Sequence, residues 1–115
     1  MVMINQLPIY RDSYILLTEI YKVTNKFARD YKYTLGQDMK RDCLDLFRHL
    51  YLANVMPKQR EEYIDRFLAA FELFEIEMRL SVDLNVMSLN KMAELALVME
   101  SINKQAKAWR KKTSK

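Results

Sequence analysis

The segment KQREEYIDRFLAAFELFEIEMRLSVDL, residues 58–84, decides the fold of this chain, because it contains neither glycine nor proline. Its apolar side chains recur every three or four residues, which is the spacing of one face of an α-helix. The face expected to be buried carries Tyr63, Phe67, Ala70, Phe74, Met78 and Ser81, and Leu73, Ile76 and Leu80 are expected to widen it. A long helix with an apolar face buries that face against other helices.

The same periodicity predicts three further helices, over about residues 8–29, 34–54 and 89–112, with a loop at 30–33. Pro8 suits the first turn of a helix. Thr34 and Gln37 read as a capping box that opens the second helix, and Ser88 reads as the N-cap of the last one. Trp109 ends the apolar row of the last helix, so we expect it to be packed against the bundle or a neighbouring subunit.

The short connections favour antiparallel neighbours. We therefore predict an all-α fold, an antiparallel up-down-up-down four-helix bundle. It forms a single domain over residues 1–112, followed by a basic tail at 113–115. With one glycine and two prolines in the chain, hairpin-rich β folds are disfavoured because their turns need these residues.

The composition limits where the protein can work. The uninterrupted apolar runs are too short to span a bilayer, and the N-terminus lacks the pattern of a signal peptide. A single cysteine excludes an intrachain disulfide framework. We expect a cytoplasmic protein with no membrane partner.

The residues that catalysis needs are scarce. The chain has one cysteine, Cys43, and one histidine, His49. At this spacing on a helix the two point in different directions, and a zinc or di-iron site needs more ligands. We read Cys43 as a buried apolar residue and His49 as a partly exposed structural one. We predict no catalytic residue, metal, cofactor or small-molecule substrate, although a metal-dependent bundle enzyme stays the third alternative.

Charge is unevenly distributed along the chain. Residues 61–100 contain three Lys or Arg against nine Asp or Glu, whereas residues 101–115 contain six basic residues and no acid. Basic side chains also share faces of the first two helices, and such stripes suit a phosphate backbone. The predicted nucleic-acid-binding residues are Lys22, Lys26, Arg29, Arg41, Arg48, Lys104, Lys107, Arg110 and Lys111.

The first helix carries a second apolar row beside its core row. This row contains Tyr10, Tyr14, Leu17 and Tyr21, and a lone four-helix bundle would leave it partly exposed. Exposed apolar patches of this kind mark interfaces. We predict that these four residues form an oligomer interface between copies of the chain.

Several short motifs, in a fixed order, carry a family resemblance. They are Tyr33-Thr34-Leu35-Gly36 at the start of the second helix, Leu52-Ala53 near its end, Arg79-Leu80-Ser81-Val82-Asp83-Leu84, the turn at Ser88, and Ile102 with Lys104 and Trp109. Over residues 7–112 the chain resembles the accessory variability determinant (Avd) of diversity-generating retroelements. That family is related to the four-helix-bundle proteins of ribosomal intervening sequences.

The resemblance implies a non-catalytic bundle that assembles into a barrel-like homopentamer with a basic surface. It also implies two kinds of partner, the retroelement's reverse transcriptase and nucleic acid (RNA and possibly DNA), in support of mutagenic cDNA synthesis. The alternative is a structural homo-oligomerisation module of the intervening-sequence type, without a specific role in nucleic-acid binding.

Overall fold

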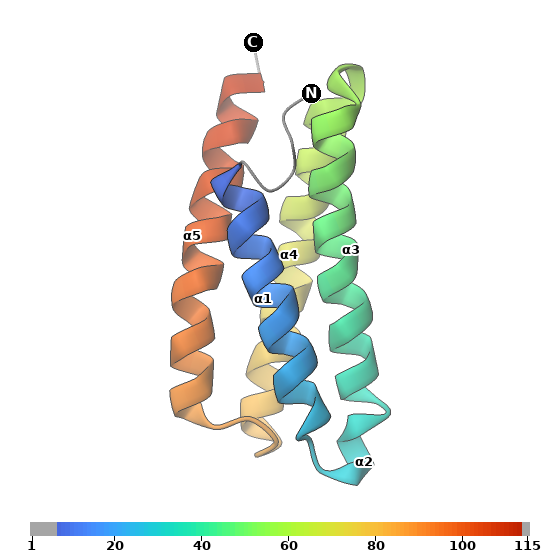
Figure 1. Cartoon of the computed structure of the whole chain (residues 1–115), viewed down its shortest axis with the longest axis vertical. Helices are drawn as coiled ribbons and strands as arrows, with labels where there is room; N and C mark the ends of the chain where they lie inside the picture. Colours follow the sequence, from blue (N-terminus) through green and yellow to red (C-terminus); the bar gives the residue numbers. More distant parts are fainter. Residues whose placement is uncertain (1–6, 114–115) are drawn as a thin grey trace.

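The computed structural model describes residues 7–113 and is helical over nearly all of that range (Figure 1). Its four long helices are α1 (Pro8–Asn25), α3 (Leu35–Val55), α4 (Arg60–Asp83) and α5 (Leu89–Thr113). A single-turn helix, α2 (Arg29–Lys32), precedes α3, and a 3-10 turn, η2 (Pro57–Gln59), precedes α4. No strand occurs within residues 7–113, so the prediction of an all-helical bundle is confirmed.

The four long helices surround one core. Helix α1 packs against α3 and α5, and α4 packs against the same two helices, which places α4 behind α1 in Figure 1. Polar contacts fix α1 to α5: Lys91 Nζ lies 2.7 Å from a carboxylate oxygen of Glu19, and the Gln105 amide donates to Asp12 at 2.8 Å. These contacts hold the first and last long helices side by side.

The core consists of large apolar side chains from all four helices. Its fully buried members include Leu16, Ile20, Met39, Leu50, Phe67, Phe71, Phe74, Met78, Leu95 and Ile102. Each helix supplies them at spacings of three and four residues, so one face of every helix points inward.

The prediction for α4 was partly wrong. Leu73, Ile76 and Leu80 do not widen the core, because their side chains are 66%, 62% and 43% exposed. Ile64 and Phe71 are buried in their place. Helix α4 carries apolar residues on its inner and outer sides alike, and spacing alone did not separate the two.

The connection between α1 and α3 also differs from its prediction. Helix α1 ends at Asn25, and residues expected to form a loop form α2 instead. Thr34 does precede α3, but its hydroxyl donates to the carbonyl of Asp30 and accepts no hydrogen bond from the first turn of α3, so no capping box forms. That bond satisfies a carbonyl of α2 that lacks a partner at the helix end.

Two other predictions for the last helix fit the structure. The Ser88 hydroxyl accepts a hydrogen bond from the backbone N–H of Lys91 at 3.0 Å, which confirms Ser88 as the N-cap. Trp109 is half-buried and packs against the hydrophobic core. The guanidinium of Arg60, at the start of α4, lies 5.6 Å from the centre of its ring.

Candidate nucleic-acid interface

The second half of α5 presents three exposed lysines on one face. Lys104, Lys107 and Lys111 follow one another at spacings of three and four residues, and each side chain is exposed. Within residues 7–113, none of the three forms an ion pair with a carboxylate. Their ammonium groups are therefore open to an anionic partner.

Arg110 lies on the same helix but is engaged within the chain. Its guanidinium contacts Asp65 at 2.5 Å and Glu61 at 3.2 Å, both on α4. Its side chain is only 23% exposed. Arg110 joins α5 to α4, and it is less suited to bind phosphate than the neighbouring lysines.

A second basic cluster lies where α1 ends. Lys26 and Arg29 are exposed and make no ion pair within the described part of the chain, while Lys22 approaches Glu19 at 3.7 Å. Glu19 is shared with Lys91, whose ammonium donates to it and lowers the pKa of its carboxyl. The cluster thus has two unengaged cations and one that is weakly paired.

The two arginines predicted on α3 face carboxylates of their own helix. Arg41 lies 3.1 Å from both Asp38 and Asp42, and Arg48 pairs with Asp45. These pairs are exposed, and exposed pairs of this kind contribute little to stability. They nevertheless neutralise part of the charge that a phosphate would meet.

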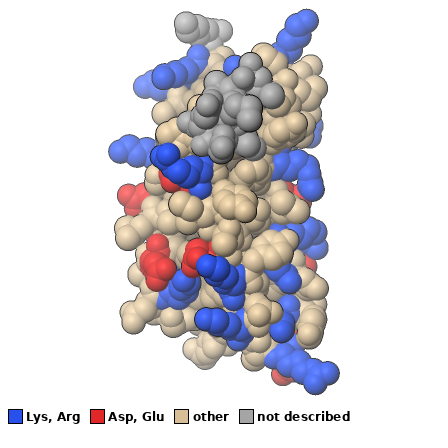
Figure 2. Space-filling model, viewed as in Figure 1, with Lys and Arg blue, Asp and Glu red and all other residues tan. Residues whose placement is uncertain are grey.

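On the face drawn in Figure 2, the basic side chains do not form a single patch. Figure 2 shows Lys and Arg side chains at both ends of this side and along its edges, with few Asp and Glu between them. In Figure 1 the end of α1 and the end of α5 lie at opposite ends of the bundle. One subunit therefore does not bring Lys26 and Arg29 together with the α5 lysines.

The four residues predicted for an oligomer interface divide into two groups. Tyr14 and Tyr21 are 62% and 47% exposed, and Leu17 is half-buried. Tyr10, by contrast, is not available on the surface of the subunit as predicted. It is 1% exposed, and its hydroxyl donates to the carbonyl of Leu50 at 2.5 Å. Tyr10 lies in the core because its ring fits between α1 and α3, near Phe47.

Residues of α3 complete an apolar surface that the sequence only half revealed. Tyr14, Leu17, Leu44 and Phe47 line a shallow cavity of about 480 Å³ between α1 and α3. We call these residues, together with Tyr21, the α1–α3 surface. A second apolar surface lies on α4, where the sequence predicted buried residues. Leu73, Ile76 and Leu80 share the side of the helix that faces away from the core. We call it the α4 surface.

Burial shifts the pKa values of three titratable side chains on α3 and α4. Burial, reinforced by the Asp42 carboxylate, raises the pKa of Glu77 to about 8. Burial raises the pKa of the Cys43 thiol to about 12 and lowers the pKa of His49. Cys43 is thus a buried, protonated thiol, and His49 is partly exposed, as predicted.

The described part of the chain contains neither a membrane-spanning helix nor a metal-binding cluster. None of the helices within residues 7–113 is both long enough and apolar enough to cross a bilayer. In the same range, no group of three or more His, Cys, Asp or Glu is placed to hold a metal ion.

Comparison with known proteins identifies the family. The sequence model of the family described as bAvd-like matches residues 1–113. No curated protein and no solved structure matches the chain. The match spans nearly the whole sequence and includes every helix described above. The chain therefore belongs to the bAvd-like family, which confirms the resemblance to accessory variability determinants.

Proposed function

We propose that this protein is a non-catalytic accessory factor of a diversity-generating retroelement, binding nucleic acid and the reverse transcriptase during mutagenic cDNA synthesis. Membership of the bAvd-like family supports an Avd-type accessory protein. The observation that carries nucleic-acid binding is the row of unpaired lysines on α5: Lys104, Lys107 and Lys111. They offer charge to a phosphate backbone without an element that reads base edges.

Assembly of several copies would unite the basic clusters that one subunit keeps apart. The α1–α3 surface and the α4 surface differ in residues and lie on different sides of the bundle, since α4 packs behind α1 (Figure 1). Two different surfaces that meet head to tail build a ring when the rotation closes. We propose such a homo-oligomer, with five subunits as the family resemblance implies and the up-down-up-down bundle as its unit.

Titration of RNA and DNA at two salt concentrations tests the nucleic-acid proposal. Charge reversal of the three α5 lysines (Lys104→Glu, Lys107→Glu, Lys111→Glu) is expected to weaken binding to both polymers. The slope of log affinity against log salt should flatten by about 2 to 3, because three fewer phosphate contacts release fewer counterions. Binding should vary little with sequence.

The matched control reverses three cations elsewhere on the bundle. Lys58→Glu, Arg66→Glu and Arg79→Glu change the net charge equally but lie in η2 and α4. This control should keep most of the affinity and the wild-type salt slope. Equal losses in both triple variants would show that only net charge matters, and unchanged binding in the α5 variant would remove the proposed site.

A structural homo-oligomerisation module is the second candidate. It is favoured by the intrachain pairing of Arg110 with Asp65, and of Arg41 and Arg48 with carboxylates of α3. Light scattering separates assembly from binding: Leu73→Asp with Ile76→Asp should yield monomers, whereas Tyr33→Asp, an exposed residue outside both apolar surfaces, should not. Co-purification with the co-expressed reverse transcriptase tests the protein partner.

A further inference from the structure

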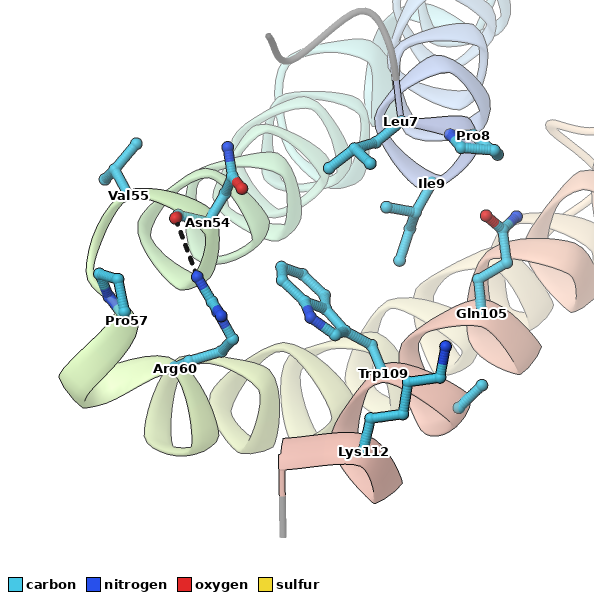
Figure 3. Close-up of a pocket in the computed structure, with 11 residues that line it drawn as sticks. Leu7, Pro8, Ile9, Asn54, Val55, Pro57, Arg60, Gln105, Trp109 and Lys112 are labelled. Atoms are coloured by element: carbon cyan, nitrogen blue, oxygen red, sulfur yellow. Dashed lines mark hydrogen bonds between the residues drawn. The ribbon is translucent and has the colours of Figure 1, made fainter. Parts of the chain in front are cut away.

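The end of the bundle where α5 terminates contains a cavity of about 840 Å³ (Figure 3). Its walls come from residues just before and within the start of α1, the end of α3, the start of α4 and the end of α5. Its volume falls in the range of small-molecule sites, about 300–1,000 Å³. The cavity lies among these four helix ends, at one end of the bundle.

Trp109 occupies the middle of this cavity. In Figure 3 its indole points inward from α5, between Ile9 of α1 and Arg60 of α4. The side chain is half-buried, so part of the ring remains accessible. An aromatic surface that is held in place and accessible on one side can stack a planar ligand.

Arg60 is fixed beside the indole rather than mobile. Its Nε donates to the carbonyl of Ala53 at 2.8 Å, and one terminal nitrogen donates to the carbonyl of Asn54 at 3.2 Å. These bonds to the end of α3 keep the guanidinium 5.6 Å from the centre of the Trp109 ring. The position of the cation is thus set before any ligand arrives, which lowers the entropy lost on binding.

The charge of the cavity favours an anionic ligand. Its described lining includes Arg60 and Lys112 and contains no carboxylate. The acidic residues that follow Arg60 on α4 are already paired: Glu61 and Asp65 with Arg110, and Glu62 with Arg66. An apolar ring, a fixed guanidinium and a lysine at the rim together match a base that carries a phosphate.

We propose that this cavity takes one unpaired base of a single-stranded nucleic acid, stacked on Trp109, with the adjoining phosphate near Lys112. The proposal rests on the nucleic-acid binding proposed above and adds a preference for unpaired strands. The α5 lysines contact phosphates of paired and unpaired polymers alike, whereas a base inside a duplex is not free to enter the cavity.

Trp109 is the single tryptophan of the chain, so its fluorescence reports on the cavity directly. The unmodified protein is titrated with a labelled single strand, with the duplex of the same sequence, and with a strand of abasic residues. Anisotropy of the label measures binding, and tryptophan emission measures stacking. The intact single strand should quench Trp109, while the duplex and the abasic strand bind without quenching.

Substitution of the ring gives a second measurement. Trp109→Leu keeps the cavity lined with an apolar side chain and should weaken binding of the intact single strand about 10-fold, leaving the abasic strand unaffected. Tyr63→Leu is the matched control, because Tyr63 also faces an arginine, Arg66 at 5.5 Å, but does not line the cavity. Circular dichroism checks that both variants are folded.

The outcomes distinguish the two proposals. If intact and abasic strands bind equally and Trp109 emission is unchanged in the unmodified protein, the base site is absent and the lysine surface stands. If no polymer binds, nucleic-acid binding itself fails, and the base site fails with it. Separate RNA and DNA strands in the same titration establish which sugar the site accepts.

Discussion

Helices α4 and α5 are neighbours of nearly equal length, yet the outer face of α4 differs from that of the second half of α5. Both bury large apolar residues at the same spacing, such as Phe74 on α4 and Ile102 on α5. Outside, α4 shows Leu73 and Ile76 among many carboxylates, whereas the second half of α5 shows lysines. The inner faces of both helices pack into the same core, so both must carry large apolar side chains. The outer faces are not constrained by the core, so function is to be read from them.

The largest effect should come from comparing adjacent residues of α4. Phe74→Ala removes a fully buried ring and should lower the free energy of unfolding by about 3–5 kcal/mol. Leu73→Ala, one residue away and 66% exposed, should change it by less than about 0.5 kcal/mol in dilute protein. Urea unfolding at low concentration measures both. Similar losses would mean that the outer face of α4 packs within the subunit.

A smaller effect is expected from the starts of the same two helices. Ser88→Ala removes the side-chain cap of α5 and should cost about 1 kcal/mol. Gln59, the N-cap residue of α4, makes no side-chain cap hydrogen bond, so Gln59→Ala should leave stability nearly unchanged. Thermal unfolding of the two variants gives the comparison. A loss at Gln59 as large as that at Ser88 would contradict it.

The third comparison concerns Glu77, at the boundary between the inner and outer sides of α4. Its pKa is raised from 4.5 to about 8 in the folded protein, so the native state holds a proton that the unfolded chain releases. The stability that this proton provides is full below the unfolded pKa and is lost as pH rises through about 8. The wild type should therefore lose stability over this range relative to Glu77→Gln.

The measurement is the difference in unfolding free energy between wild type and Glu77→Gln at several pH values. Taking the difference removes the contribution of His49, which titrates in both proteins. A difference that does not change with pH would show that Glu77 ionises normally in the folded state.

Periodicity predicted the four helices and most of the core, because each helix has a single buried face that recurs locally in the sequence. It misplaced Leu73 on α4, where apolar residues occur on both sides. It also placed Tyr10 with the exposed tyrosines, although the Leu50 carbonyl that binds its hydroxyl lies on another helix.

The site was predicted less completely than the fold. The lysines of α5 could be found because their exposure follows from their own helix. The engagement of Arg110 depends on Asp65, far away in the sequence, and no local pattern encodes it. The cavity beside Trp109 is a product of four helix ends, so it became visible only in three dimensions.

The burial of Cys43 has a practical consequence for labelling. It is the single cysteine of the chain, it is 2% exposed, and its pKa of about 12 leaves almost no thiolate at neutral pH. Maleimide dyes react with accessible thiolates, so the native chain should remain unlabelled. A cysteine introduced at exposed Ser101 would then be the one reactive position in each copy. Stepwise photobleaching of such a derivative would count the copies in an assembly.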